Sequence, residues 1–296
     1  MTRFWKQMVP KLSAGAFAGL ILTLVVGLVQ PLQAQDVEPY YRNLQQRLVA
    51  DGFDADWIAK IYSRPEIVFE VDNVSLYFVH NESKLNYDQF ATRKHIKNAR
   101  RYMSEHADAL GKAQKQFGVD PEVITAIILV ETKLGTYLGR STIFNNLSTM
   151  AVMSETAQRK DIWIALPADR RIEKAKFEKK ADRKSVWAYK ELKALLTYAR
   201  QEKIDPGGIN GSYAGAMGIS QFMPSNIPLF AQDGNGDGRI DLFNHSDAIS
   251  SIANYLKHYG WKPGLSKEAA KKVVYHYNHS KYYVNIVLKI SERLKS

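Results

Sequence analysis

The stretch VITAIILVETKLGTYLG, residues 123–139, is almost entirely apolar until a single carboxylate, Glu131, near its end. Ile124, Ile127 and Ile128 fall on the same helical face as Glu131, because residues spaced i, i+3, i+4 and i+7 lie on one side of a helix. Acidic side chains are rarely buried without compensation. The stretch therefore predicts a mostly buried helix that carries an acid on its apolar side, in its last turn.

The residues around this helix mark its ends. Asp120 suits the N-cap, Pro121 suits the first helical position and Gly135 suits the stop. A carboxyl group in an apolar pocket has a raised pKa and keeps its proton at neutral pH, as a general acid requires. The simpler interpretation is a helix-end acid that pairs with Lys or Arg or faces solvent. The stretch alone leaves both interpretations open.

Composition restricts the class of protein. The 296 residues can form one large domain or two smaller lobes, and the chain has no cysteine. Disulfides, zinc sites made of Cys and lipid attachment through an N-terminal Cys are therefore excluded. A formal net charge of +11 favours anionic partners such as wall polymer, a phospholipid surface or nucleic acid. A solvated basic surface explains the same charge.

The first 34 residues are typical of a targeting segment. Arg3, Lys6 and Lys11 precede a long apolar run, and Ala34 suits the last residue before cleavage. An uncleaved membrane anchor is the competing interpretation. Removal of residues 1–34 takes away three cations and no acids, so the net charge falls from +11 to +8. Both interpretations place the rest of the chain outside the cytoplasm.

Helical spacing dominates the remainder, so the chain is predicted to be all-α or nearly so. Two short helices are expected within 40–67, and a short strand or extended arm at 73–81. Further helices are expected over these ranges: 88–117, 187–202, 247–259 with Ser246 as N-cap, 267–277 and 281–294. Residues 159–184 hold ten Lys or Arg and five Asp or Glu, and predict an exposed, partly mobile excursion.

The stretch DGNGDGRID, which begins at Asp233, has the spacing of a calcium loop. Asp233, Asn235 and Asp237 take positions 1, 3 and 5, and Gly238 takes position 6, where the chain turns sharply. Arg239 at position 7 would bind through its carbonyl oxygen. The alternative is a polar surface turn. The spacing favours a structural calcium ion of modest affinity.

One position departs from the usual calcium loop. Asn244 stands at position 12, where a bidentate Glu is usual. Asp241 at position 9 would act through water, and Asp247 would close the site if the loop is longer. Asp247 also suits the first turn of a helix, where an acid is favoured by the helix dipole.

Two further segments suit ligand contact. GSYAGAMGISQFMP, residues 211–224, lacks the ending of a phosphate loop but offers Ser212, Gln221 and Phe222 beside small residues. A tight turn packed by glycine explains it equally well. YHYNHSKYY, residues 275–283, is rich in the tyrosine and asparagine that suit sugar binding. Its two histidines have no third metal ligand, so we reject a metal site there. Nucleic-acid binding has only charge to support it.

Five segments in order resemble lytic murein transglycosylases of the B type. They are GVDPEVITAIILVETKLGTYLGR, GSYAGAMGISQFMPS, DGNGDGRIDLFNHSDAISSIANYL, HYGW and YNHS. The resemblance covers residues 36–296 and implies a mainly α fold. It implies an N-terminal helical lobe at 35–100 and a lysozyme-like catalytic domain at 101–296, with a basic insertion at 159–184 and an EF-hand-like calcium loop at 233–247.

The resemblance also implies a reaction. Such enzymes cleave the β-1,4 bond between N-acetylmuramic acid and N-acetylglucosamine in peptidoglycan without water, and leave a 1,6-anhydro end. Glu131 matches the single catalytic acid and base. The matching glycan contacts are Ser212, Gln221, Phe222, Tyr255, Tyr277 and Asn278. Tyr277 would also orient Glu131. The matching calcium ligands are Asp233, Asn235, Asp237, the carbonyl of Arg239 and Asp247.

Two departures accompany the resemblance. The basic segment 159–184 is longer than the family's connection, and would bind wall polymer or an envelope partner, reshape the glycan groove, or serve as a solvated insertion. Lys133 and Leu134 stand where an Arg and an aromatic residue are frequent. A periplasmic location is expected, with membrane contact only if the leader is retained. A water-using muramidase and a non-catalytic wall-binding scaffold remain the alternatives.

Overall fold

The computed structural model describes residues 38–79 and 86–296, which belong to one compact unit, Ala34–Ser296. The predicted leader lies outside the described residues. The α-helices, in chain order, are α1 (Glu38–Ala50), α2 (Ala55–Tyr62), α3 (Val71–Val79), α4 (Arg93–Glu105), α5 (Ala107–Phe117), α6 (Pro121–Thr132), α7 (Ile143–Ala151), α8 (Thr156–Ala165), α9 (Lys174–Glu202), α10 (Ile227–Phe230), α11 (His245–His258), α12 (Lys267–Tyr277) and α13 (Lys281–Lys295).

Strands are few, and the predicted mainly α fold class is confirmed. In the described part of the chain, β1 (Ser141–Thr142) pairs with β2 (Asn210–Gly211) in an antiparallel ribbon. The ribbon depends on Gly139, where a Cβ atom would lie 2.0 Å from the carbonyl oxygen of Gly211. None of the helices within residues 38–79 and 86–296 is both long and apolar enough to cross a membrane.

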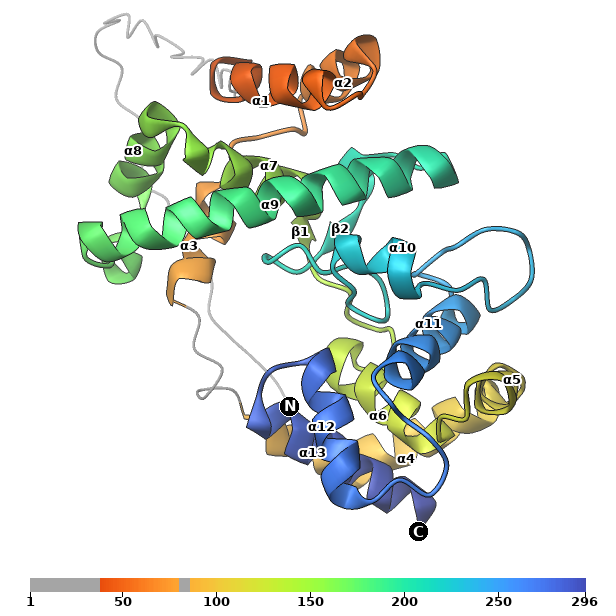
Figure 1. Cartoon of the computed structure of the whole chain (residues 1–296). Coiled ribbons are helices and arrows are strands. Elements are labelled where there is room, and N and C mark those ends of the chain that lie inside the picture. The colour runs from red at the N-terminus through yellow and green to blue at the C-terminus, as the bar shows by residue number, and fades with distance from the viewer. Residues whose placement is uncertain (1–37, 80–85) are drawn as a thin grey trace, which may run out of the picture. The chain divides into compact units, whose positions relative to one another are not determined.

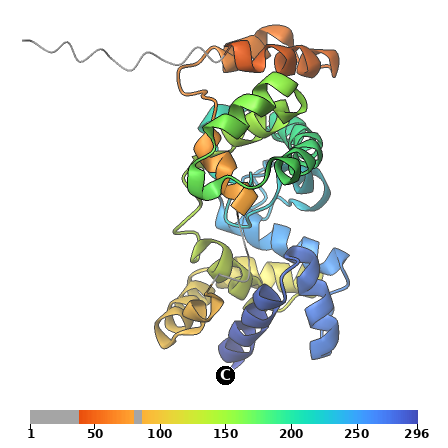
Figure 2. The ribbon, with the colours of Figure 1, turned by 90° about the vertical axis from the view of Figure 1, so that its left-hand side faces the viewer.

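The helices bury two hydrophobic clusters. The first is formed mainly by α1, α2, α3, α7, α8, α9 and α10, and α9 runs beside α7 (Figure 1). The second is formed by α4, α5, α6, α11, α12 and α13, and the blue C-terminal helices lie beside α4 and α6 (Figure 1, Figure 2). Tyr259 and Tyr277 pack against both clusters. The predicted domain boundary at residue 100 falls inside α4, and the domain limits stay a prediction.

Several helices were predicted correctly. The pair within 40–67 is α1 and α2, and the two C-terminal helices are α12 and α13. α6 begins at Pro121 after Asp120, as predicted. It ends at Lys133, which takes a left-handed conformation two residues before Gly135. The helix expected from 247 begins earlier as α11, and the side chain of Asn244, rather than that of Ser246, caps it.

The predicted strand at 73–81 was wrong, because its described part belongs to α3. Val74 and Phe78 are buried, and their i, i+4 spacing places them on one helical face against the first cluster. β-Branched and aromatic residues gave this short segment the composition of a strand. The tertiary packing of α3 against α7 selects the helix instead.

The single helix predicted at 88–117 was also wrong. The structure has a 3₁₀ helix (Tyr87–Ala91), then α4 and α5, with a break at His106 (φ −113°, ψ 26°). The ring of His106 stacks on that of His245 at 4.4 Å between centroids. Tyr102 contacts the same ring through a 2.9 Å hydrogen bond between its hydroxyl and Nδ1. These distant partners, which the local pattern does not show, hold the break.

The excursion predicted at 159–184 is largely exposed, but it is helical and packed against the first cluster. Most of this segment forms α8 and the first part of α9. Ile162, Leu166 and Phe177 are buried in the first cluster. Arg159 forms ion pairs with Glu178 at 3.0 Å and with Asp182 at 2.7 Å. The charged residues cover a helical face, while apolar residues scattered between them supply the buried one.

Candidate active site

Glu131 lies in the last turn of α6 and is half-buried. The predicted apolar face is present, since Ile124, Ile127 and Ile128 are fully buried in the second cluster. This face fixes the rotation of the helix, because its burial is lost if the helix turns. The carboxylate is therefore held in one direction by the packing of the residues that precede it.

The turn after Glu131 is unusually tight. Lys133, Leu134 and Gly135 all have positive φ angles, of 50°, 65° and 80°. Residues other than glycine reach this region at a cost of roughly 1–3 kcal/mol each. Two hydrogen bonds offset it, from the amide of Lys133 to the carbonyl of Leu129 and from Leu134 to Ile128. The departure from the family pattern at Lys133 and Leu134 is thus accommodated by a strained helix end.

The same turn is fixed to two other segments. The hydroxyl of Thr132 contacts the carbonyl of Ile219 at 3.3 Å and accepts the amide of Gly135 at 3.0 Å. Gly135 also packs against the ring of His245, where a Cβ atom would lie 2.7 Å from Cε1. The end of α6 is therefore clamped between the loop before Gln221 and the start of α11.

Two tyrosines lie near Glu131, and Tyr283 is buried whereas Tyr277 is half-buried. Burial raises the pKa of Tyr283 well above its usual value, and the charge of Glu131 adds to the rise. Burial is also the main cause of the raised pKa of Tyr277, with the charge of Glu131 second. The two rings are parallel, with centroids 6.4 Å apart. Glu131 therefore lies beside two aromatic side chains at the end of an apolar helix.

Tyr283 was not among the predicted site residues. A signal for it exists in the sequence, because Tyr283, Ile286, Val287 and Ile290 recur at i, i+3, i+4 and i+7. All four are buried on one face of α13, which packs against α6. Tyr283 is the member of this face that carries a polar tip.

The hydroxyl of Tyr277 has a partner other than Glu131. It donates to the carbonyl of Ser220 at 2.5 Å, and a hydroxyl has only one proton to donate. Tyr277 thus holds the loop that contains Ser220. Its implied role in orienting Glu131 stays a prediction.

The segment 211–222 forms a small set of turns beside these tyrosines. Ser212 forms two hydrogen bonds with Ala216. The amide of Ser212 donates to the carbonyl of Ala216 at 2.8 Å, and the amide of Ala216 donates to the hydroxyl of Ser212 at 3.0 Å. Gly218 is pressed against Leu242, where a Cβ atom would lie 2.6 Å from the Leu242 carbonyl oxygen. Glycine is required here because no side chain fits.

Gln221 is held in a strained conformation within this segment. Its φ is 50°, and its side-chain amide donates to the carbonyls of Gly218 at 2.9 Å and Leu138 at 3.4 Å. These bonds fix the amide group and leave its oxygen as an acceptor for a ligand. Strain of this kind concentrates at functional sites.

The predicted aromatic contacts form a packed cluster. Phe222 and Tyr255 are 2% and 6% exposed, so they support the site more than they line it. Ring centroids lie 5.7 Å apart for Phe222 and Tyr255 and 5.0 Å apart for Tyr255 and Tyr277. Asn278 is half-buried and caps the end of α12. Phe222 and Tyr255 thus connect to Tyr277 through ring contacts, and Asn278 follows Tyr277 in the chain. Tyr277 in turn lies near Glu131.

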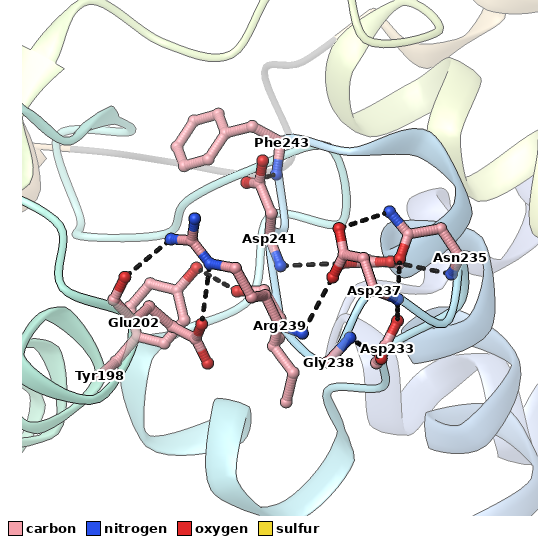
Figure 3. Close-up of polar contacts among 11 residues, drawn as sticks. Tyr198, Glu202, Asp233, Asn235, Asp237, Gly238, Arg239, Asp241 and Phe243 are labelled. Carbon is pink, nitrogen blue, oxygen red and sulfur yellow. Dashed lines mark hydrogen bonds and ion pairs between the residues drawn. The ribbon is translucent and has the colours of Figure 1, made fainter.

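The loop that begins at Asp233 is ordered by its own side chains (Figure 3). The carboxylate of Asp233 accepts backbone N–H groups of Gly236 at 2.6 Å, Asp237 at 3.2 Å and Gly238 at 2.8 Å. These bonds hold the pKa of Asp233 below its usual value. The amide of Asn235 donates to Asp237 at 2.9 Å.

Asp247 closes the loop from the first turn of α11. It is fully buried, and burial raises its pKa against the opposite effect of its hydrogen bonds. One oxygen accepts the amides of Gly234 and Asn235, and the other accepts that of Asp241 at 2.8 Å. One lone pair of this carboxylate thus remains for a cation.

A hard cation fits the chemistry of this loop. Its side-chain donors are carboxylate and amide oxygens, which calcium prefers. Within the described ranges, no three His, Cys, Asp or Glu side chains converge as in an assembled metal site. Asp233, Asn235 and Asp237 nevertheless lie together in one loop, and Asp247 accepts the backbone amide of Gly234 from the same loop.

Arg239 anchors the loop to α9 (Figure 3). Its guanidinium donates to the carbonyl of Glu202 at 2.7 Å and lies 3.7 Å from the Glu202 carboxylate. The Tyr198 hydroxyl donates to the carbonyl of Ile240 at 2.9 Å. The carbonyl of Leu242, which belongs to this loop, accepts a hydrogen bond from the amide of Ile219. The loop therefore also supports the segment that holds Gln221.

Comparison with known proteins gives a consistent family. Residues 36–271 match the family model for the Transglycosylase SLT domain. The membrane-bound lytic murein transglycosylase B of Escherichia coli strain K12 is 35% identical over 176 residues. That match covers 60% of this chain and 41% of the relative, so it spans about two fifths of the relative's length.

Solved structures agree on the fold. The E. coli lytic transglycosylase Slt35 in complex with calcium superposes with a TM-score of 0.68 and 25% identity, over 87% of this chain and 93% of that one. SltB3 from Pseudomonas aeruginosa, in complex with NAG-anhNAM-pentapeptide, gives a TM-score of 0.70 at 20% identity, over 88% and 80% of the two chains. The expected helical architecture is therefore confirmed.

Proposed function

Because this chain belongs to the Transglycosylase SLT domain family, we propose that it is a peptidoglycan lytic transglycosylase. The observation that carries the proposal is the setting of Glu131, at the end of a buried apolar helix and beside the buried Tyr283 and the half-buried Tyr277. The substrate is the glycan strand, cleaved between N-acetylmuramic acid and N-acetylglucosamine. The product carries a 1,6-anhydro end.

Glu131 acts as both acid and base in this reaction. Its proton passes to the glycosidic oxygen as the bond from that oxygen to the anomeric carbon breaks. The 6-hydroxyl oxygen of the muramic acid then bonds to the same carbon and returns its proton to Glu131. The buried hydroxyl of Tyr283, which is close enough for the charge of Glu131 to raise its pKa, would orient the carboxylate through both steps. No water is consumed.

A single acid suffices because the nucleophile belongs to the substrate. Ordinary glycosidases need two carboxylates. Among the described acids, Glu191 and Asp247 are also buried, but both are committed to other bonds. Glu191 accepts the amide and hydroxyl of Ser225 at 2.9 Å and 2.8 Å. Asp247 accepts three backbone amides. Neither is available as a second catalytic group.

The glycan would be bound by groups that surround Glu131. Ser212, Gln221 and Asn278 offer hydroxyl and amide groups for the sugar hydroxyls and acetamides. Tyr277 acts through the loop that it holds at Ser220. Phe222 and Tyr255 form the wall behind Tyr277 and maintain its position.

We extend the proposal to a structural calcium ion in the loop 233–247. Its ligands would be the side-chain oxygens of Asp233, Asn235 and Asp237, the carbonyl of Arg239 and the remaining lone pair of Asp247. A bound cation would screen these clustered negative charges and stabilise the loop. The relative Slt35, which has been solved with calcium, supports this assignment.

The proposed location is the periplasm, with or without anchoring by the leader. The basic segment 159–184, once expected to recruit an envelope partner, keeps that role only as a prediction. Arg170 and Lys180 donate to Ser75 and to the carbonyl of Phe78. Arg171 donates to the carbonyls of Ile164 and Leu166. These cations serve the packing of the segment.

Mass spectrometry of products from purified peptidoglycan tests the proposed reaction. A lytic transglycosylase yields anhydro ends, which are lighter by one water than reducing ends. Reducing ends alone would identify a water-using muramidase and overturn the proposal. Wall binding without any cleavage, over a range of substrates and pH values, would instead identify a scaffold.

A further inference from the structure

A cationic cleft lies between the start of α4 and the end of α13, away from the residues assigned to the glycan site. Its volume is about 350 Å³. The residues that line it are Arg93, Ile96, Lys97, Arg100, Arg293 and Ser296. Four of the six side chains are cationic and none is acidic. Ile96 is buried and contributes an apolar surface between the charges.

The charges of this cleft are not compensated. Within residues 38–79 and 86–296, Arg93, Lys97, Arg100 and Arg293 form no ion pair with a carboxylate. Arg100 donates to the carbonyl of Arg293 at 2.8 Å, and Arg293 donates to that of Ala91. Carbonyl groups orient these two guanidinium groups but leave their charge in place.

The placement of these cations is unfavourable for the helix itself. Arg93 is the first residue of α4, and the first turn contains no acid. A helix N-terminus carries partial positive charge and disfavours cations. Arg93, Lys97 and Arg100 are spaced at i, i+4 and i+7, so like charges share one face. A bound anion would relieve both the repulsion and the dipole penalty.

The basic segment 159–184 differs from this cleft in how its cations are paired. Arg159 is paired with Glu178 and Asp182, and Lys176 with Glu173. The nitrogen of Lys184 lies 3.7 Å from the ring centroid of Tyr77 and 3.1 Å from that of Trp187. Many of its cations therefore already have partners. The cleft of α4 and α13 has fewer cations, but they are open to a ligand.

We propose that the cleft formed by Arg93, Lys97, Arg100 and Arg293 binds a phosphate group. Guanidinium groups bind phosphate oxygens through paired N–H donors, and three of the four cations are arginines. A phospholipid headgroup and a soluble phosphate present the same chemistry to such a cleft.

The test compares two triple variants of the full chain. The first is Arg93→Gln with Lys97→Gln and Arg100→Gln. The matched control is Lys174→Gln with Lys176→Gln and Lys179→Gln, which removes the same charge from exposed positions of α9. Both variants keep the N-terminal segment, so any contribution of that segment to membrane binding is equal. Thermal melting confirms that both fold.

Two probes distinguish the sources of phosphate. Co-sedimentation measures binding to phosphatidylcholine vesicles with and without phosphatidylglycerol, and calorimetry measures binding of pyrophosphate. Each cation near an anionic surface contributes a factor of roughly five, so the cleft variant should bind phosphatidylglycerol vesicles roughly 100-fold more weakly. If the site binds a phospholipid headgroup, the cleft variant must show this loss of vesicle binding. If the site binds soluble phosphate, the cleft variant must lose pyrophosphate binding but keep vesicle binding.

Several outcomes would overturn the proposal. Equal losses in the cleft variant and the control would show that net charge, and not this cleft, attracts the anion. Failure of the wild-type chain to bind either probe at low salt would remove the site altogether. If the cleft variant fails to fold, the variant that replaces Arg93 and Arg100 with Lys keeps the charge. It should bind phosphate more weakly than the wild type, because Lys lacks the paired N–H donors of Arg. Binding equal to that of the wild type would contradict the proposed arginine contacts.

Discussion

Two regions of this protein carry acids in opposite surroundings. In the loop from Asp233 to Asp247, the carboxylates accept backbone N–H groups, and Asp233 and Asp247 accept three each. At the end of α6, Glu131 faces the rings of Tyr277 and Tyr283. An acid whose lone pairs are used by amides maintains a backbone shape. An acid among apolar and aromatic groups keeps its capacity to exchange a proton.

The difference shows where function resides. Acids whose oxygens accept several backbone amides stabilise the fold, because their removal leaves those amides without partners. Glu131 is half-exposed, so its loss should leave the fold intact. Five substitutions or changes of condition test this contrast, from the largest expected effect to the smallest.

Glu131→Gln should lower the cleavage rate roughly 1000-fold, because an amide cannot donate and recover the proton. Turbidity of a peptidoglycan suspension gives the rate, and circular dichroism gives the melting temperature, which should stay within a few degrees of the wild type. Activity above a tenth of the wild-type rate would remove Glu131 from the mechanism.

Asp247→Ala should cost roughly 3 kcal/mol of stability, because the amides of Gly234, Asn235 and Asp241 lose their acceptor. Chemical denaturation measures the change. Asp241→Ala is the control, since its exposed carboxylate accepts only the amide of Phe243 and its loss should cost under about 1 kcal/mol. Equal costs would contradict the structural role of Asp247.

Tyr283→Phe should lower activity roughly tenfold and move the alkaline limb of the pH–rate profile to higher pH. A hydrogen bond donated by the Tyr283 hydroxyl would favour the ionised carboxylate, so removal of the hydroxyl should favour the protonated acid. Tyr277→Phe is the comparison. It releases the carbonyl of Ser220 and should raise KM without moving the limb. A shift in the second variant alone would reverse the two roles.

Calcium should raise the melting temperature of the wild type relative to a chelator. Saturation to about 100 times the dissociation constant would add about 2.7 kcal/mol of stability. Asp233→Asn should reduce the shift, because one of the anionic ligands is lost. A wild-type chain whose melting temperature is the same with calcium and with chelator would exclude the proposed ion.

The smallest effect concerns acid stability without metal. Backbone amides hold the pKa of Asp233 below 3.8, so its contribution is fully present above that pH. It is lost as the pH falls through the lower, folded-state pKa. Asp233→Asn should therefore flatten the stability curve below about pH 4. A parallel decline in both proteins, measured by melting in calcium-free buffer, would contradict this assignment.

Local sequence predicted much of the second hydrophobic cluster. The apolar spacing before Glu131 and the capping residues of α6 were sufficient to place the acid on a buried face. The helices α12 and α13 were also predicted to within one residue of their observed ends. Hydrophobic periodicity is informative here because each helix buries one continuous stripe.

The failures share a physical cause. α3 looked like a strand because its residue types suit both structures, and its packing against α7 decides the outcome. The break at His106 depends on His245, which is distant in sequence. The segment 159–184 looked exposed because its charges outnumber its apolar residues, although Phe177 and Ile162 are buried. None of these partners is visible in a local window.

The sequence by itself determined that an acid would project from a buried helix and that a loop of acids and glycines would follow. These features depend on spacing and backbone preference, which are local. Only the tertiary structure decided which tyrosines lie near Glu131 and which cations line one cleft. Both depend on contacts between residues more than a hundred positions apart, because packing against α13 brings them together.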